Sequence, residues 1–328
     1  MTDNTELKHT LEDLKHLQEL PLERKIMVSQ TRIMEWYYRN SGRVTVSFSG
    51  GKDSTVLLHL VRQQFPDVAG VFINTGLEYP ELVAFVKSFD NIIIHRPKKN
   101  FRQVIADHGY PVVSKDVAYI IESYRNGAKF AKERIAGVKK DGTESPYRIS
   151  RFTKWKHLID APFKISEECC HYMKKEPLTR FTKDTGYLPY VGTLATESKR
   201  RRDGWLKLGC NSFDSTSPRS APLSFWTEQD ILRYIHEYGL SLAPPYGEVI
   251  KTEKKGVVTY STTNMDRTGC MFCLFGCHLE KSPNRIQRMA KTHPKLHEYC
   301  LRDFEDGGLG LRKVMEFIGL PYEREDKK

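Results

Sequence analysis

Residues 44–61 contain three consecutive patterns, which read Val44-Thr-Val-Ser-Phe48, Ser49-Gly-Gly-Lys-Asp-Ser54 and Thr55-Val-Leu-Leu-His-Leu-Val61. The first run is short and rich in β-branched residues, which predicts a strand. The last run predicts a helix, with Asp53 or Ser54 expected as its N-cap. The glycines of the middle run let main-chain N–H groups approach an anion at the positive end of that helix. The segment therefore predicts a strand, a phosphate-binding loop and a helix.

The side chains of this loop also suit a phosphate ligand. Ser49 and Ser54 offer hydroxyl donors, Lys52 can neutralise phosphate oxygens, and Asp53 can cap the helix or help to hold Mg²⁺. The loop lacks the GxxxxGK[ST] pattern of a Walker A sequence. We expect the whole loop to contact the phosphates of a nucleotide: Ser49, Gly50, Gly51, Lys52, Asp53 and Ser54.

Outward from the loop, strand and helix patterns alternate. We expect strands at 69–73, 91–95 and 188–192 and helices at 80–89, 112–126 and 227–237. This rhythm predicts an α/β fold with a mostly parallel sheet and helices on both faces. The predicted organisation is a helical extension at 1–40, a nucleotide-binding domain at 41–240 with an insertion or lid at 124–157, and a cysteine-containing subdomain at 241–328.

Composition limits the classes of protein that the chain can represent. It has 328 residues, of which 39% are hydrophobic and 28% charged, as in ordinary soluble proteins. No apolar run approaches the roughly 20 residues that cross a bilayer, and the polar N-terminus does not resemble a signal peptide. We therefore expect a cytoplasmic protein with no membrane partner. The net charge of +11 suits a nucleotide or nucleic acid partner, although a plain basic surface explains it equally well.

The chain has seven cysteines, an odd number that argues against a disulfide framework in a cytoplasmic protein. Cys270 and Cys273 form a CxxC pair, Cys277 follows closely, and Cys169 and Cys170 are adjacent. Thiolates select iron–sulfur clusters or zinc. Adjacent cysteines fit two irons of one cluster better than a single zinc ion. The residues alone leave an iron–sulfur cluster, a structural zinc site and unligated thiols open.

The segment SFSGGKDSTVLLHL resembles the PP-loop of the adenine nucleotide α-hydrolase-like superfamily and, within it, the phosphoadenosine phosphosulfate (PAPS) reductase family. Three further segments are similar to family motifs. Residues 74–81 resemble a segment that closes over the nucleotide, 192–201 resemble one that faces the charged groups of the substrate, and 222–230 resemble a helix start. The resemblance implies nucleotide contacts from Asn74, Thr75, Gly76, Glu197 and Ser198, and catalytic roles for Lys52, Asp53 and Arg201.

The cysteines are similar to the CC…CxxC arrangement that holds a [4Fe–4S] cluster in one branch of these reductases. The resemblance implies that Cys169, Cys170, Cys270 and Cys273 bind such a cluster. Cys277 is then a substitute ligand, a reactive thiol that carries sulfur, or a buried apolar residue.

The resemblance leaves three reactions to compare. SGGKDS is the intact ATP-pyrophosphatase form of the loop, and Leu194 stands where the family motif has arginine. Both features favour ATP over PAPS. We therefore expect adenylation by ATP and Mg²⁺ coupled to sulfur transfer, with a separate sulfur donor and with tRNA or DNA as a candidate acceptor. The first alternative is reduction of PAPS or adenosine phosphosulfate to sulfite with thioredoxin. The second is a non-catalytic nucleotide-binding accessory subunit.

Overall fold

The computed structural model describes residues 7–138, 141–144 and 153–324. These residues form two compact units, each built from separate stretches of chain. The first unit takes its residues from 1–74, 78–96 and 178–268, and the second from 75–77, 97–177 and 269–328. The two units therefore alternate along the chain. The domain boundaries expected near residues 40 and 240 stay a prediction.

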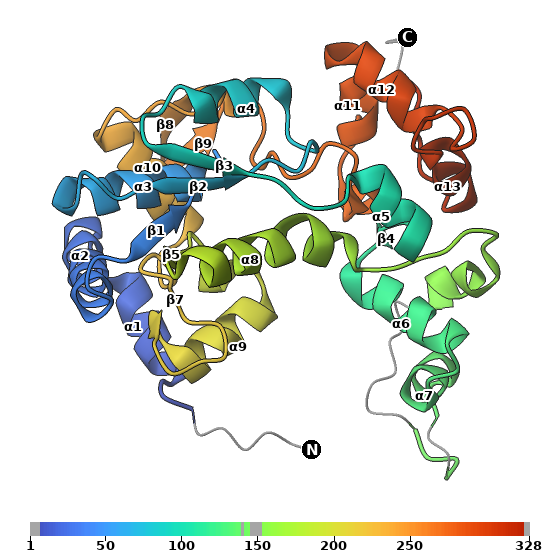
Figure 1. The fold of residues 1–328 in the computed structure, drawn as a ribbon, viewed down its shortest axis with the longest axis horizontal. Helices are drawn as coiled ribbons and strands as arrows, with labels where there is room; N and C mark the ends of the chain where they lie inside the picture. Colours follow the sequence, from blue (N-terminus) through green and yellow to red (C-terminus); the bar gives the residue numbers. More distant parts are fainter. Residues whose placement is uncertain (1–6, 139–140, 145–152, 325–328) are drawn as a thin grey trace. The chain divides into compact units, whose positions relative to one another are not determined.

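The first unit is built on a six-stranded sheet (Figure 1). Its strand order is β3 (Ile92–His95), β2 (Gly70–Ile73), β1 (Val44–Ser47), β5 (Leu188–Tyr190), β7 (Arg219–Ser220) and β6 (Asn211–Ser212). Every described pairing is parallel except that of β6 with β7. The expected α/β class with a mostly parallel sheet is confirmed.

The strand order reverses beside β1, and this reversal determines where a ligand fits. The chain proceeds from β1 to β2 and β3 on one side and adds β5 on the other side. The connections that follow β1 and β5 therefore diverge at the carboxyl ends of these strands. Open α/β sheets bind their ligands at such a reversal of strand order. The loop at Ser49–Ser54 follows β1 directly and lies at this point.

Helices flank this sheet. Those predicted from the sequence have bounds close to the expected ones, whereas α8 and α9 were not predicted. They are α1 (Leu11–Glu19), α2 (Leu22–Arg39), α3 (Lys52–Gln64), α4 (Pro80–Lys87), α9 (Lys199–Leu208) and α10 (Glu228–Glu237), together with most of α8 (Glu176–Thr185). The hairpin of β8 (Val249–Lys254) and β9 (Val257–Thr262) also belongs to this unit. The hairpin was not predicted from the sequence, because lysines and threonines mask the alternation of apolar and polar residues along its strands.

The N-terminal helices contribute to the core of the first unit. Trp36 and Ile33 of α2 are fully buried. The hydroxyl of Tyr190 on β5 donates to the carbonyl of Ile33 at 2.8 Å, and the indole of Trp226 donates to the Ser29 hydroxyl at 2.9 Å. The expected helices in this region are present, and α2 is integral to the packing of the sheet.

The second unit is mostly helical. It contains α5 (Phe101–His108), α6 (Lys115–Arg125), α7 (Lys129–Ala136), α11 (Arg285–Thr292), α12 (Pro294–Leu301) and α13 (Leu311–Phe317). Its short strands β4 (Val112–Val113) and β10 (Leu274–Phe275) pair in parallel and join distant parts of the chain. The helix expected at 112–126 therefore starts later than predicted, at Lys115, because Ser114 caps it.

The insertion or lid expected at 124–157 lies partly outside the described residues, at 139–140 and 145–152. In its described part, the guanidinium of Arg125 donates to the carbonyls of four residues between 158 and 163, at 2.7–3.0 Å. These bonds connect the end of α6 to the segment that follows the insertion. No described helix has the length and apolar character needed to cross a membrane.

Candidate nucleotide and cysteine sites

The phosphate loop turns tightly between β1 and α3, and its glycines are required by geometry. Gly50 has a φ of +72°, a left-handed conformation that favours glycine. A β-carbon there would lie 2.7 Å from Val86 Cγ2. Gly51 is the N-cap of α3 and provides no side-chain cap. The helix therefore begins at Lys52, and the N-cap expected at Asp53 or Ser54 is wrong. The first N–H groups of α3 have no side-chain acceptor, as an anion site requires.

The hydroxyl groups of the loop hold its shape. The N–H of Ser49 donates to Ser54 Oγ at 3.2 Å, and Ser54 Oγ donates to the Gly51 carbonyl at 2.9 Å. Thr55 Oγ1 donates to the same carbonyl at 3.0 Å. These bonds connect the two ends of the turn. The loop is therefore preorganised in the absence of a ligand.

Gly192 after β5 lets a second segment approach the start of α3. A β-carbon at this position would lie 3.2 Å from the carbonyl group of Asp53 and from the amide nitrogen of Ser54. Any larger residue would push the two segments apart. The glycine of the 192–198 motif therefore has a packing role beside the phosphate loop.

Lys52 is buried, and its charge is already neutralised. Its ammonium group pairs with the carboxylate of Glu228 and donates to the carbonyl of Asp266 at 2.8 Å. Glu228 lies in the first turn of α10. The sequence reading did not single out Glu228 or Asp266, although Glu228 lies within the 222–230 motif.

A second charged group surrounds Glu197. Its carboxylate pairs with Arg201 and, at 3.6 Å, with Arg267, and it accepts from the Leu194 N–H at 3.1 Å. Ser198 caps α9 by accepting from the Arg201 N–H at 3.3 Å. Burial lowers the pKa of Arg201, and the nearby carboxylate of Asp53 opposes that shift. Leu194 itself is buried.

Asp53 connects these charged groups electrostatically. Burial raises the pKa of its carboxyl group, and the charges of Lys52, Arg267 and Arg201 counteract this effect. One of its oxygens, Oδ1, is buried without a hydrogen-bond partner. A buried polar atom without a partner costs free energy unless a ligand, ion or water satisfies it. Asp53 is therefore a carboxylate available to a bound group.

Asn74, Thr75 and Gly76 follow β2. The Asn74 N–H donates to the His95 carbonyl at 2.9 Å within the first unit. Thr75 Oγ1 accepts from the Leu77 N–H at 3.1 Å within the second unit, and Gly76 has a φ of +74°. Asn74 thus lies at the same edge of the sheet as the phosphate loop. The nucleotide contacts expected from these three residues stay a prediction.

The four cysteines implied by the CC…CxxC pattern line one cavity in the second unit. Cys169, Cys170, Cys270 and Cys273 share it with apolar side chains that include Leu77, Phe101 and Met173. Its volume is about 20 Å³, room for little more than one water molecule. The sulfur atoms of Cys169 and Cys170 are 4.0 Å apart. Residues more than a hundred positions apart in the sequence therefore meet around one space.

Main-chain hydrogen bonds bring these cysteines together. The Tyr110 N–H donates to the Lys164 carbonyl at 2.9 Å, which places the segment before Cys169 beside β4. The pairing of β4 with β10 then places the CxxC turn beside the same strand. The Met271 N–H donates to the Leu77 carbonyl at 2.8 Å and attaches the other side of that turn.

The thiols of the cavity differ in protonation. The Cys169 thiol donates toward Cys170 and lowers the pKa of Cys170 to about 5, with a further contribution from the charge of Lys115. The same hydrogen bond and burial raise the pKa of Cys169. Burial raises the pKa of Cys273 to about 12. A positive charge in the cavity would stabilise all of these thiols as thiolates.

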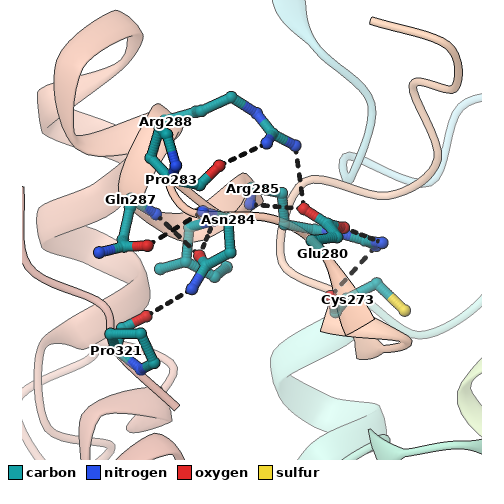
Figure 2. A network of polar contacts seen from close by, with 9 residues as sticks. Cys273, Glu280, Pro283, Asn284, Arg285, Gln287, Arg288 and Pro321 are labelled. Atoms are coloured by element: carbon teal, nitrogen blue, oxygen red, sulfur yellow. Dashed lines mark hydrogen bonds and ion pairs between the residues drawn. The ribbon is translucent and has the colours of Figure 1, made fainter. Parts of the chain in front are cut away.

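Arg285 supports the CxxC turn from α11 (Figure 2). Its guanidinium donates to the Cys273 carbonyl at 3.3 Å, and its main-chain N–H donates to Glu280 at 2.7 Å. Arg288 also pairs with Glu280, at 2.9 Å. Asn284 caps α11 and donates to the Pro321 carbonyl at 2.7 Å. The network connects the cysteine turn to the C-terminal helices.

Other thiols lie outside the cavity. Cys277 and Cys300 are almost completely buried, and burial raises the pKa of both, to about 11 for Cys277. Cys277 does not line the cavity.

Within the described ranges, no three His, Cys, Asp or Glu side chains lie close enough together to hold one metal ion. The thiolates of a cubane cluster bind different irons, so they need not converge on one point.

The chain belongs to the family of the phosphoadenosine phosphosulfate reductase domain, whose family model matches residues 43–134 and 117–274. These ranges contain the phosphate loop, the charged group around Glu197 and the four cavity cysteines. The resemblance drawn from the loop and the three further motifs is thereby confirmed.

Three relatives are informative. An uncharacterized protein of Methanocaldococcus jannaschii is 27% identical over 161 residues, which are 41% of this chain and 39% of that protein. The phosphoadenosine 5'-phosphosulfate reductase of Vibrio campbellii is 23% identical over 239 residues, covering 71% of this chain and 73% of the reductase. Sulfate adenylyltransferase subunit 2 of Hyphomonas neptunium is 24% identical over 272 residues, covering 78% of this chain and 68% of that protein. Two of these three carry the names of enzymes of sulfur metabolism.

Proposed function

We propose that this chain is an enzyme of sulfur chemistry that binds ATP at the loop Ser49–Ser54 and uses it to adenylate a substrate. The observation that carries this proposal is the uncapped start of α3 behind Gly50 and Gly51, preorganised by the loop's own hydroxyl groups where the strand order reverses beside β1. Main-chain N–H groups in this arrangement bind phosphate oxygens.

In the proposed reaction, an oxygen of the substrate attacks the α-phosphorus and the bond to pyrophosphate breaks. The N–H groups at the start of α3 would stabilise the charge that develops on the leaving pyrophosphate. Lys52 would add its charge by exchanging Glu228 for a phosphate oxygen. A sulfur donor would then displace AMP from the adenylated substrate. Arg201 and Arg267, which face Glu197, are the groups suited to an anionic substrate.

Mg²⁺ and an iron–sulfur cluster suit the residues that are present. The unpartnered Oδ1 of Asp53 is an oxygen donor of the kind that Mg²⁺ prefers, and the metal would supply further charge stabilisation to the pyrophosphate. Cys169, Cys170, Cys270 and Cys273 offer four thiols around one apolar cavity, as a [4Fe–4S] cluster requires. When bound, the cluster would supply electrons or carry sulfur. The chain's own residues hold the thiols apart from bulk solvent.

Reduction of PAPS or adenosine phosphosulfate with thioredoxin is the second candidate, and the named reductase relatives favour it. Two features of the chain argue against it. Leu194 places a buried apolar side chain where the family motif has arginine. Cys300, the cysteine nearest the C-terminus, is fully buried and its thiol pKa is raised, so it is a poor nucleophile. The relatives compared above do not point to tRNA or DNA as the acceptor, which stays a prediction.

One pair of assays separates these functions. We expect the anaerobically purified protein to release pyrophosphate from ATP and Mg²⁺, faster with the true acceptor, tested first with bulk tRNA and DNA. Sulfite formed from PAPS and thioredoxin, without pyrophosphate release from ATP, would favour the reductase. Tight ATP binding with neither product would contradict both enzymatic proposals and favour the accessory subunit.

A further inference from the structure

The first unit contains a cavity of its own, distinct from the cysteine cavity of the second unit. It lies at the amino ends of the parallel strands, whereas the phosphate loop lies at their carboxyl ends. Its volume is about 580 Å³, within the range of small-molecule sites. Residues that begin or precede the first three strands line its floor: Val44 and Thr45 of β1, Val68 and Ala69 before β2, and Asn91 before β3. All lining residues belong to the first unit. The site is therefore separate from the loop, which follows the opposite end of β1.

The C-termini of three helices converge on this cavity. Each of α2, α3 and α8 precedes a parallel strand, so each ends at the amino edge of the sheet. Tyr37, Gln64 and Thr185, from the last turns of these helices, all line the cavity. Helix C-termini carry partial negative charge, and arginines neutralise part of it here: Arg43 donates to the Thr185 carbonyl at 2.9 Å and Arg62 to the Val68 carbonyl at 3.2 Å. Asp67 is the single charged residue of the lining and adds a negative charge.

The walls are aromatic and suit a flat ligand. Tyr37 and Phe65 stack with ring centroids 3.6 Å apart and an angle of 3° between the rings. Phe181 and Tyr187 also line the cavity, and the Arg43 guanidinium lies 5.9 Å from the centroid of the Tyr187 ring. Tyr37 and Phe65 cover one face of each other, so a planar heterocycle would stack on another ring face of the lining.

Gln64 adds a polar group whose hydrogen bonds are unmade. Both its amide nitrogen and its amide oxygen are buried without a partner, although the residue lines the cavity. An amide offers one acceptor and two donors and pairs with the edge of a nucleobase. An unpaired buried amide costs free energy, which a bound partner would recover once the side chain turned toward it.

We propose that this cavity binds an amine-bearing nucleobase, stacked on its aromatic walls and held by Gln64 and Asp67. The exocyclic amine donates to an acceptor, which the Asp67 carboxylate in the lining provides. The site therefore selects cytosine over uracil, because these bases differ by the amine at position 4. The base comes from a free nucleoside or from an unpaired base of a nucleic acid strand. The net charge of +11 suits the second source.

The test uses cytidine and uridine, which carry no phosphate, in the presence of saturating ATP and Mg²⁺ to occupy the loop. We expect cytidine to bind at least about tenfold more tightly than uridine, measured by ligand-observed NMR or calorimetry. The variants Gln64→Leu and Tyr37→Leu should each weaken cytidine binding about tenfold or more. Tyr119→Leu is the control, because Tyr119 lies on α6 of the second unit, is 42% exposed and does not line the cavity. Melting curves confirm that each variant is folded.

A second arm distinguishes the two sources. The probe is a short single strand with one unpaired cytosine. If it binds more tightly than cytidine to the wild type, and no more tightly to Tyr37→Leu, the base comes from a strand. Equal affinities assign it to a nucleoside. Absence of cytidine and strand binding would overturn the proposal. So would equal affinity for cytidine and uridine.

Discussion

The phosphate loop and the cysteine cavity are built in opposite ways. The loop is one contiguous stretch of six residues whose shape is held by local hydrogen bonds, and its Lys52 is already bonded to the Glu228 carboxylate and the Asp266 carbonyl. The cavity collects its four thiols from two segments a hundred residues apart, through main-chain bonds to Tyr110, β4 and Leu77, and its other lining residues are apolar except for Lys174. We therefore expect nucleotide binding to tolerate loss of one loop side chain, and a cluster in the cavity to depend on all four thiols.

The largest expected effect is therefore in the cavity. Cys273→Ser should remove all or nearly all bound iron and sulfide from anaerobically purified protein, because a cubane cluster needs each of its four thiolates. Iron and acid-labile sulfide content and the visible absorbance spectrum measure this. Cys210→Ser is the control, since Cys210 belongs to the first unit and does not line the cavity. Full iron content in Cys273→Ser, or stoichiometric zinc without iron in the wild type, would refute the cluster.

A single substitution in the phosphate loop should weaken nucleotide binding without abolishing it. Lys52→Ala should weaken ATP binding roughly 10- to 100-fold, or about 1.4–2.7 kcal/mol, because the main-chain N–H groups remain. Calorimetry with ATP and Mg²⁺ gives the constants. An unchanged affinity would mean that Lys52 does not contact the nucleotide.

Glu228→Gln is the companion variant to Lys52→Ala. It removes the charge that competes with phosphate for the Lys52 ammonium group. We expect ATP to bind several-fold more tightly to this variant. A weaker affinity would assign Glu228 to nucleotide or metal binding.

A smaller effect tests the packing beside the loop. Gly192→Ala places a methyl group 3.2 Å from the main chain of Asp53 and should lower the free energy of unfolding by about 1–3 kcal/mol. Gly204→Ala is the matched control, because Gly204 lies inside α9 with open space around it. That change should raise stability by about 0.5–1 kcal/mol. Urea unfolding without nucleotide measures the free energy of unfolding of both variants. Equal changes in the two variants would contradict the close approach of Gly192 to the main chain of Asp53.

The smallest effect concerns Asp53. Burial raises the pKa of this carboxyl group above its ordinary value of 3.8, so the folded state holds the proton more tightly than the unfolded state. The wild type therefore loses stability as the pH rises from that ordinary value through the raised one. Asp53→Asn should melt higher than the wild type at neutral pH, without Mg²⁺ or nucleotide, and the difference should vanish in acid. A difference in melting temperature that does not depend on pH would show that burial does not raise the pKa of Asp53.

Much of the fold follows from local patterns. The strands at β1, β2 and β3 and the helices α3, α4 and α10 appear where alternation and helical spacing predict them, because these signals depend on neighbours a few residues away. The start of α3 differs from the prediction. Ser54, a residue type that favours N-caps, instead bonds to the Gly51 carbonyl inside the loop. The β8–β9 hairpin was missed because exposed strands carry few apolar residues.

The sequence by itself determined the phosphate loop, the α/β class and the identities of the four cavity cysteines. Each of these depends on a contiguous motif or on a family pattern. Only the tertiary structure decided that Glu228 and Asp266 neutralise Lys52, that Asp53 is left with an unpartnered oxygen, and that Gln64 lines a cavity at the far edge of the sheet. The physical reason is that pairing, burial and cavity walls depend on side chains that the folded backbone brings together from distant positions.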